Sequence, residues 1–406
     1  MIKNNQIKTK ILFVIESLAL AGSEKSLVAL LNNLNSARYD IDLQLFSYEG
    51  ELSKFLPSYV NILPPLEYTQ FSAQKWSVKV QQVFLNNKLP YLKSMLTYSL
   101  ALRQRKRNHT EIAKLYWEKV HSAYKKQPQK YDVAIAYAQG VPTFYVIDKI
   151  TADKKVAWVN ANVEFTDLNL NFQEKFYERY DSIVAVSKTT REHFVTIFPA
   201  FSNKMYFIPD MIDYRTIVKM AESRIPGYKA NIFNILTVAR LEKGMKGLDI
   251  AISAAKILRD QKIIFHWYFL GKGSYLGEMI SFIKEHQLEN YVTLLGTTAN
   301  PYPFFKAADL YVQTSRSESY GISIAEARLL NVPIVTTRFD SVFVQMVEDK
   351  NGLVVDVNAE AVALAIIRLM TDKDLYNSIV EYLKAEEKEN TETVVLFDEL
   401  IAEFSR

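Results

Sequence analysis

Residues 310–327 read LYVQTSRSESYGISIAEA, and this stretch decides the fold class. It opens with a short apolar run over residues 310–313, crosses a polar loop and turns into a helical pattern near Gly321. A short apolar run followed by a helix is typical of a βα unit, whose strands form a parallel sheet covered on both faces. The stretch therefore predicts α/β architecture.

The same alternation recurs on both sides of this stretch. In the first half of the chain the apolar runs predict strands at residues 11–16, 42–46, 133–137, 156–159 and 183–186. In the second half they predict strands at residues 233–239, 263–270, 292–295, 310–313, 334–337 and 353–355. Because 406 residues are enough for two large domains, we expect two doubly wound, Rossmann-like domains.

The domain junction is expected between residues 208 and 228, where two prolines and a glycine interrupt any sustained strand pattern. We place the hinge near Asp213. The predicted organisation is an N-terminal domain at 1–212, a C-terminal domain at 213–385, and a final helical segment at 386–406 that packs back across the junction.

The composition excludes several classes of protein. Hydrophobic residues make up 49% of the chain, which is enough apolar surface for a globular core. The absence of cysteine excludes disulfides and thiolate chemistry and fits a cytoplasmic protein. A net charge of +4 is too small to indicate nucleic-acid binding. The apolar run at 11–20 is about half the ~20 residues that span a bilayer, so we expect no signal peptide and no transmembrane helix.

Residues 75–130 form a basic segment, with thirteen lysines and arginines, Arg105 and Lys106 among them, but only two acidic residues. Apolar side chains such as Trp76 and Phe84 are interspersed with these charges, which predicts amphipathic helices with cationic faces. Such faces would bind an anionic membrane surface peripherally, and the binding would weaken as salt rises. The alternative is a solvated helical insertion with no partner.

Two loops that follow predicted strands carry residue types suited to a charged ligand. The first contains Arg240 and Lys246, after the strand at 233–239. Ligands of open α/β sheets lie beyond the carboxyl ends of the strands, and two fixed cations there could clamp a diphosphate. The alternative is a solvated loop in which Arg240 pairs with Glu242.

The second loop contains Glu318 and leads into the helix that begins near Gly321 and carries Glu326. The free amides and the positive dipole end of that helix favour an anion such as phosphate. Carboxylates accept hydrogen bonds from sugar and ribose hydroxyls. The alternative is structural: one carboxylate complements the helix dipole and the other lies at the surface.

The pattern Glu318-x7-Glu326, with Arg240 and Lys246 upstream, resembles the donor site of the retaining glycosyltransferases of the GT-B fold, family 4, or glycosyl transferases group 1. The resemblance runs over nearly the whole chain. It includes AGSEK at 21–25, AYAQGVPTF at 136–144, KVAWV at 155–159, VAVS at 184–187 and IPDMID at 208–213.

The resemblance implies two domains that face each other across a cleft. A nucleotide-diphosphate sugar would lie in the C-terminal domain and its acceptor against the N-terminal domain. Arg240 and Lys246 would then hold the diphosphate. Glu318 would bind the donor sugar, and Glu326 the ribose hydroxyls. The further implied donor contacts are the backbone of Tyr320, Gly321 and Ile322 at the phosphates, and the loops at Gly271 and Thr297 at the base.

Two positions depart from the family pattern. Asn160 stands where the family usually has a histidine that touches the donor sugar, and an asparagine can bind a hydroxyl but cannot titrate. Ala21 precedes Gly22 where the family normally has two adjacent glycines. Gly22 and Ser23 still allow a close approach to the donor phosphate or to the acceptor.

The implied reaction needs no cofactor. Cations and helix-end amides stabilise the charge that grows on the departing diphosphate, so no metal ion is expected. Retention of configuration at the anomeric carbon, which the resemblance implies, means that the acceptor hydroxyl attacks from the same face that the diphosphate leaves. An oxygen of the departing diphosphate would then accept the proton of that hydroxyl. The triplets Asp40-Ile-Asp42 and Asp372-Lys-Asp374 could suggest a magnesium site, but we expect a structural role for both.

We therefore expect a hexosyl- or N-acetylhexosaminyl-transferase that moves a sugar from a UDP-linked donor to a lipid-linked or polymeric cell-surface glycan, such as a polysaccharide or teichoic acid. It would act at the inner face of the cell membrane. Two alternatives stay open: a nucleotide-sugar epimerase, and a non-catalytic partner or glycan-binding subunit on the same fold. The fate of the donor distinguishes the transferase, the epimerase and the non-catalytic subunit from one another.

Overall fold

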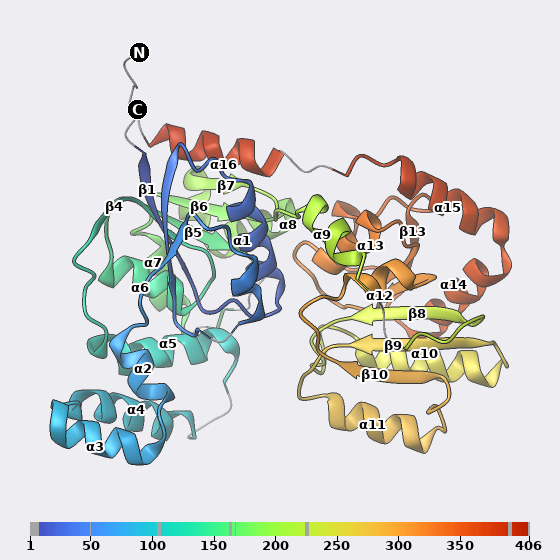
Figure 1. Cartoon of the computed structure of the whole chain (residues 1–406), viewed down its shortest axis with the longest axis horizontal. Helices are drawn as coiled ribbons and strands as arrows, with labels where there is room; N and C mark the ends of the chain where they lie inside the picture. The colour runs from blue at the N-terminus through green and yellow to red at the C-terminus, as the bar shows by residue number, and fades with distance from the viewer. Residues whose placement is uncertain are drawn as a thin grey trace. The chain divides into compact units, whose positions relative to one another are not determined.

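The computed structural model of the chain describes residues 8–48, 50–103, 107–161, 165–166, 168–223, 227–388 and 392–404. The chain divides into two compact units (Figure 1). The first unit contains residues 1–211 and 391–406, and the second contains residues 212–390. Each unit is built around its own parallel sheet, and the two are described separately.

The first unit holds a seven-stranded sheet in which every pairing is parallel. Its strands follow the order β3 (Val60–Ile62), β2 (Tyr39–Leu45), β1 (Thr9–Ile15), β4 (Lys130–Ala136), β5 (Thr151–Val159), β6 (Ser182–Ala185) and β7 (Met205–Phe207). Side chains alternate across the sheet, so Leu12 and Val14 enter one core while Ile11 and Phe13 enter the other.

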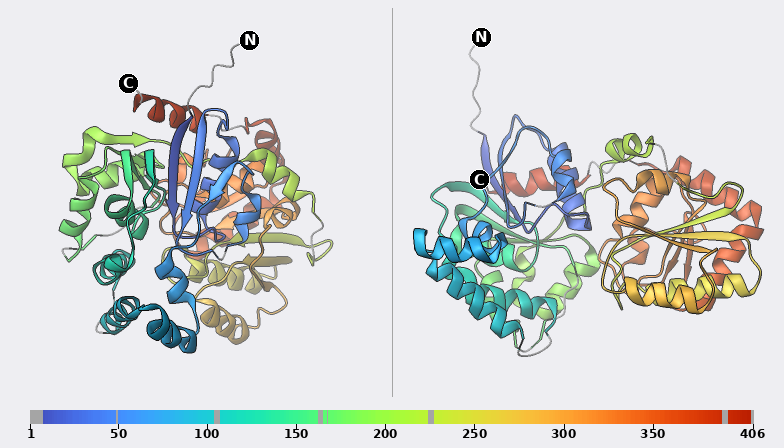
Figure 2. Two further views of the ribbon diagram at one scale, coloured as in Figure 1. Left: turned by 60° about the vertical axis from the view of Figure 1, so that its left-hand side comes forward. Right: turned by 60° about the horizontal axis from the view of Figure 1, so that its bottom comes forward.

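Helices cover both faces of this sheet (Figure 2). They are α1 (Gly22–Asn33), α2 (Glu67–Ala73), α3 (Trp76–Asn86), α4 (Leu89–Leu102), α5 (His109–Val120), α6 (Val141–Lys149), α7 (Leu170–Tyr177), α8 (Lys188–Ile197) and α16 (Glu392–Glu403). The last helix, α16, buries Phe397, Leu400 and Ile401 in the same core as Phe13. Arg38 and Tyr39 both bond to the Asp398 carboxylate on its surface. Helix α16 therefore belongs to the first unit, although it follows the second unit in the sequence.

The second unit holds a six-stranded, fully parallel sheet. Its order is β10 (Val292–Gly296), β9 (Phe265–Leu270), β8 (Phe233–Val238), β11 (Leu310–Gln313), β12 (Ile334–Thr337) and β13 (Gly352–Val355). Its helices are α9 (Tyr214–Ala221), α10 (Leu248–Asp260), α11 (Leu276–Glu285), α12 (Tyr302–Ala307), α13 (Ile322–Leu329), α14 (Ala359–Thr371) and α15 (Lys373–Ala385). The order reverses direction after β8, which is the switch point of a doubly wound sheet.

The two parallel sheets confirm the predicted fold class of two Rossmann-like units. All eleven predicted strands are present, with ends shifted by a few residues. The strands β3 and β7 are not predicted by the sequence. Each is only three residues long and lies at an edge of the first sheet, so neither presents the long apolar run of a central strand.

The basic segment folds into α3, α4 and α5, while Arg105 and Lys106 lie outside the described residues. α5 is anchored in the core, since Trp117 is buried and stacks on Tyr124. The exposed side chains of α3 and α4 include large apolar ones, among them Trp76, Phe84, Leu89 and Leu100. None of the helices in the described ranges has the length and apolar character needed to cross a membrane.

Candidate functional site

Four loops meet at the carboxyl edge of the second sheet, after β8, β9, β10 and β11. Backbone hydrogen bonds connect them in series. Gly271 N donates to Gly296 O at 2.6 Å, and Leu241 N donates to Lys272 O at 2.9 Å. Arg316 N donates to Met245 O at 2.7 Å. The loops that carry most of the predicted site residues therefore form one connected rim.

Glycines allow these loops to approach so closely. Gly247 has φ +58°, and a Cβ at this position would lie 1.8 Å from the carbonyl oxygen of Thr314. A Cβ on Gly271 would lie 1.9 Å from the carbonyl oxygen of Ala239. Both separations are far below van der Waals contact, so any side chain would force the loops apart. Gly271, a predicted donor contact, thus also has a structural reason to be glycine.

Lys246 and Glu318 form an ion pair on this rim. The Lys246 ammonium nitrogen lies 2.6 Å from Glu318 Oε1, and the two side chains are only 21% and 15% exposed. The same carboxylate oxygen accepts hydrogen bonds from Ser315 Oγ at 2.7 Å and from Gln313 Nε2 at 3.2 Å. Charge-assisted bonds of this kind hold both partners in fixed positions. The structure brings these two predicted residues together.

Gln313 and Ser315 are contacts that the sequence reasoning did not single out. Gln313 ends the apolar strand β11 and is nevertheless buried, as is Ser315. A polar residue at the carboxyl end of an otherwise apolar strand is a signal that could have found Gln313. The loop is further fixed by Ser341 Oγ, which donates to Glu318 O at 2.6 Å, and by Thr337 Oγ1, which donates to Ser315 O at 2.5 Å.

The loop after β11 leads into α13. Gly321 immediately precedes this helix with φ +77°, and Ile322 is the first helical residue. A left-handed conformation at this point suits glycine, and the first amides of the helix have no carbonyl partner within the helix. Tyr320 lies just before the turn and is partly buried against the core of the second unit. The predicted phosphate contacts are therefore at the start of a helix.

Glu326 lies inside α13 and is only 1% exposed. Tyr302 Oη donates a hydrogen bond to its Oε1 at 3.1 Å. Burial raises the pKa of Tyr302 well above its usual value, and the nearby Glu326 raises it further, so this hydroxyl stays protonated as a donor. Glu326 is thus a buried carboxylate with a defined orientation rather than a surface residue.

Arg240 and Thr297 lie on more open parts of the same rim. The Arg240 side chain is 60% exposed, and its guanidinium lies 3.5 Å from Glu242. This pairing is the one that the alternative interpretation of the loop predicts. Thr297 directly follows Gly296 at the end of β10. Unlike Lys246, Arg240 has room to change its partner.

The other predicted residues belong to the first unit. Gly22 begins α1, and the Ser23 hydroxyl donates to Glu24 at 2.6 Å. Asn160 follows β5 at the carboxyl edge of the first sheet. Its side-chain oxygen and nitrogen are both buried, and neither has a hydrogen-bond partner within the described ranges. Buried amide groups rarely lack partners, so Asn160 is a candidate for a ligand contact.

The two Asp-x-Asp triplets have structural partners. Asp42 accepts hydrogen bonds from Asn61 at 2.6 Å and from Tyr131 at 2.9 Å. Asp372 accepts one from Leu375 N at 2.9 Å and caps α15. Across the described part of the chain, no group of three histidine, aspartate or glutamate side chains is arranged to hold a metal ion.

Comparison with known proteins adds a family match and two relatives. Residues 221–386 match the model of the family described as glycosyl transferases group 1. One relative is the N-acetylgalactosamine-N,N'-diacetylbacillosaminyl-diphospho-undecaprenol 4-alpha-N-acetylgalactosaminyltransferase of Campylobacter jejuni. The two proteins are 28% identical over 199 aligned residues, and the alignment covers 49% of this chain and 53% of that protein. The chain is 27% identical over 214 residues to the poly(glycerol-phosphate) alpha-glucosyltransferase of Bacillus subtilis, which covers 52% of this chain and 31% of that protein.

A solved structure extends the likeness to the fold of the whole chain. Anabaena HepE in complex with UDP-glucose matches with a TM-score of 0.67 and 18% identity, over 97% of this chain and 98% of that one. At this identity the match shows the fold, and it agrees with the two Rossmann-like units seen here. Of the two sequence relatives, the chain spans about half of the first and about a third of the second.

Proposed function

We propose that this chain, whose residues 221–386 match the model of glycosyl transferases group 1, is a glycosyltransferase that uses a nucleotide-diphosphate sugar. The proposed donor is a UDP-sugar, bound at the rim of loops in the second unit. The proposed acceptor is a glycan or lipid-linked glycan of the cell surface. The observation that carries the proposal is the Lys246–Glu318 pair at 2.6 Å beside the start of α13.

This rim suits the charge changes of sugar transfer. Breaking the anomeric bond leaves negative charge on the departing diphosphate. In the proposal Lys246 and Arg240 stabilise that charge, together with the backbone amides at Gly321 and Ile322. Positive groups that are already fixed in place lower the barrier without reorganising during the reaction. We therefore propose a reaction that needs no metal ion.

The two carboxylates have separate proposed roles. Glu318 binds a donor-sugar hydroxyl and steadies the positive charge that develops on the sugar ring. Glu326 is buried one turn into α13, and it accepts hydrogen bonds from the ribose hydroxyls. We propose retention of configuration, with a leaving-group oxygen of the diphosphate accepting the proton, so neither glutamate acts as a nucleophile.

Asn160 is the proposed contact from the first unit. Its two buried polar atoms have no hydrogen-bond partner in the described part of the chain, which is costly unless a ligand supplies one. A sugar hydroxyl can both donate to the oxygen and accept from the nitrogen. Asn160 would then recognise the sugar without taking part in proton transfer. Gly22 and Ser23, at the start of α1, are proposed to approach the donor phosphate or the acceptor.

The exposed apolar side chains of α3 and α4 support peripheral membrane association. Phe84 is 83% exposed and Trp76 is 56% exposed, on helices of the basic segment. Apolar side chains can enter a bilayer interface while lysines contact anionic headgroups. Flotation with anionic vesicles should recover the protein at low salt and less of it at high salt. Phe84→Ser should weaken the binding. Leu364→Ser is the matched control, because it also replaces an exposed apolar side chain with serine but lies in the second unit, and it should leave the binding unchanged.

A panel of nucleotide sugars and glycan acceptors tests the proposed activity. A transferase releases free nucleotide and enlarges the acceptor, an epimerase converts the donor sugar, and a binding subunit does neither. Glu326→Gln should lower affinity for UDP more than affinity for its 2′-deoxy analogue, because only UDP offers the 2′ hydroxyl. Folded protein that binds no nucleotide sugar, or that binds one equally well after Glu326→Gln and Lys246→Ala, would contradict the proposed donor site.

A further inference from the structure

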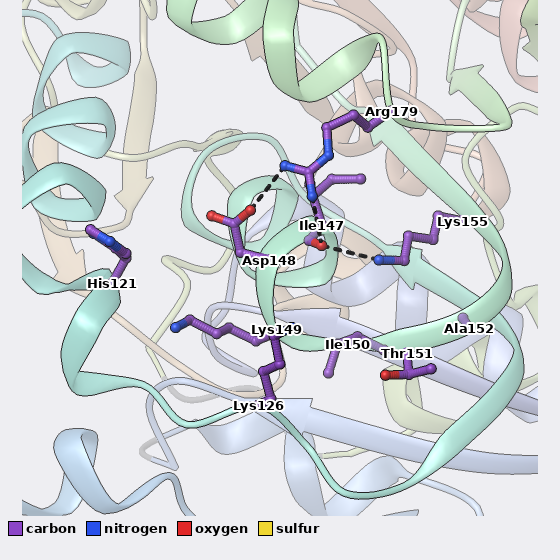
Figure 3. Close-up of a pocket in the computed structure, with 10 residues that line it drawn as sticks. All are labelled: His121, Lys126, Ile147, Asp148, Lys149, Ile150, Thr151, Ala152, Lys155 and Arg179. Carbon is purple, nitrogen blue, oxygen red and sulfur yellow. Dashed lines mark hydrogen bonds and ion pairs between the residues drawn. The ribbon is translucent and has the colours of Figure 1, made fainter.

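The first unit contains a pocket of about 460 Å³ at the amino end of β5 (Figure 3). Helix α6 ends there, and the neighbouring walls come from the segment after α5 and the turn after α7. The side chains with titratable groups are His121, Lys126, Asp148, Lys149, Lys155 and Arg179. Asn160 follows the other end of β5, so this pocket is distinct from the proposed transfer site.

The pocket has more positive than negative charge. Four of its lining residues are lysine or arginine, and Asp148 is the only acidic one. Asp148 is already engaged, because one of its oxygens accepts from Arg179 at 3.0 Å and the other accepts from the Trp117 indole at 2.9 Å. One carboxylate cannot neutralise four cations. The lining therefore carries a net positive charge.

Two of the cations are held in place by the end of α6. Lys155 Nζ donates to the carbonyl oxygen of Ile147 at 3.1 Å, and Arg179 donates to the same oxygen at 3.4 Å (Figure 3). The carboxyl end of a helix carries partial negative charge and exposes carbonyls of this kind. A neutral carbonyl orients a cation but does not cancel its charge. Arg179 is also paired with Asp148, whereas no carboxylate of the described residues forms an ion pair with Lys155, so Lys155 keeps its charge available for a ligand.

The other two cations, Lys126 and Lys149, have no ion pair among the residues that the structure describes. Burial lowers the pKa of Lys149, and the smaller effects of Asp148, which raises it, and Lys126, which lowers it, oppose each other. Burial also lowers the pKa of Lys155, and Arg179 lowers it further, against smaller opposite effects of Asp148 and Asp181. Mutual repulsion of partly desolvated cations is a cost to the folded chain, and an anion would relieve it.

We propose that this pocket binds a phosphate group of an anionic ligand. Phosphate fits the lining because its oxygens accept from several ammonium and guanidinium donors at once. The phosphate belongs either to a soluble phosphorylated compound or to a lipid headgroup, and both would present the same oxygens. The inference does not depend on the proposed transferase activity, since none of the lining residues belongs to the proposed donor site.

The Trp117 indole provides a local probe, because its N–H bonds to Asp148 in the pocket wall. Pyrophosphate would be titrated into the full-length protein while the indole ¹⁵N–¹H resonance of Trp117, assigned with Trp117→Phe, is followed. We expect a saturable shift of this resonance. The double variant Lys126→Gln/Lys149→Gln should weaken the binding by about tenfold or more, since it removes two charge-assisted contacts to the phosphate.

A matched control is Lys54→Gln/Lys284→Gln, which removes two exposed lysines outside the pocket and should leave the binding unchanged. Circular dichroism would establish that all variants are folded. No shift of the Trp117 resonance, or equal affinity in the pocket variant and the control, would overturn the proposal. Given a pyrophosphate response, weaker binding to phosphatidylglycerol vesicles by the pocket variant than by the control, with both carrying Phe84→Ser to reduce attachment through α3, assigns the phosphate to a lipid. Equal vesicle binding by both variants assigns it to a soluble compound.

Discussion

The Lys246 ammonium lies 2.6 Å from the Glu318 carboxylate, at the junction of the loops after β8 and β11. In the proposed function these two residues bind opposite parts of the donor, Lys246 the diphosphate and Glu318 the sugar. Their pairing keeps both groups ordered before the donor arrives. It also means that a diphosphate must compete with Glu318 for the same ammonium.

Lys246→Ala should lower nucleotide affinity by about ten- to a hundredfold, because it removes a charge-assisted contact to the diphosphate. Calorimetric titration with UDP measures this loss. Lys243→Ala is the matched control, since Lys243 lies on the same loop but pairs with Glu278 at 2.8 Å. Equal affinities for the two variants would remove Lys246 from the donor site.

Glu318→Gln should separate binding from turnover. The substitution keeps the size of the side chain and removes the charge that competes for Lys246, so nucleotide affinity should hold or rise. Turnover should fall by roughly a hundredfold or more, as expected when a group that stabilises transition-state charge is lost. Steady-state kinetics on the best donor tests this. A fall in affinity with unchanged turnover would place Glu318 in ground-state binding alone.

The contribution of Arg240 to UDP affinity should depend on its neighbour Glu242. The two side chains are exposed and lie 3.5 Å apart, so Glu242 competes with any diphosphate for the guanidinium. Arg240→Ala should weaken UDP binding, and Glu242→Gln should leave it equal or strengthen it. Both effects should shrink as salt rises, because the pair is exposed to solvent. If neither Arg240→Ala nor Glu242→Gln changes the affinity, the solvated-loop interpretation holds instead.

Gly247→Ala should destabilise the second unit far more than Gly244→Ala. Both glycines have positive φ, so each substitution carries the strain of a side chain in that conformation. At Gly247 the new Cβ would also lie 1.8 Å from the Thr314 carbonyl oxygen, whereas at Gly244 it would meet open space. Thermal unfolding monitored by calorimetry gives the comparison. Similar melting temperatures would mean that the two loops can separate without cost.

Asp210 should make the stability of the first unit depend on pH. Burial raises the pKa of this carboxyl from 3.8 to about 7, against a smaller opposite effect of Ser26. Between these values the unfolded chain has released the proton while the folded chain still holds it. The free energy of unfolding therefore falls as pH rises through this window and levels off above it.

Asp210→Asn removes that dependence. Relative to the unsubstituted chain, the variant should gain on the order of 1–3 kcal/mol between about pH 5 and pH 8. Denaturant unfolding at several pH values measures the difference. Asp132→Asn provides a control at a more exposed carboxylate of the first unit, which accepts from Lys10 N at 2.7 Å. A constant difference between Asp210→Asn and the unsubstituted chain across this range would show that Asp210 is ionised in the folded state.

Some features of the molecule could be predicted because their signals are local in the chain. The apolar runs at Leu310–Gln313 and Ile334–Thr337 coincide with β11 and β12, and the helix predicted near Gly321 begins at Ile322. Buried parallel strands are short and apolar on both faces, and glycines mark the turns that follow them. The edge strand β3 has no such signal, because it is only three residues long and two of them are exposed, whereas the longer edge strands β10 and β13 present apolar runs.

The amino-acid sequence by itself determined two α/β halves, a basic segment of amphipathic helices and the residue types of a diphosphate and sugar site. Periodicity, turn residues and charge are properties of neighbouring residues, so they can be read along the chain. The tertiary structure decided that Lys246 pairs with Glu318, that Gln313 and Ser315 share its carboxylate, and that Glu326 is buried against Tyr302. It also brought Lys126 to the pocket around Arg179. These contacts join segments far apart in sequence, and only the packing of strands and helices sets their distances.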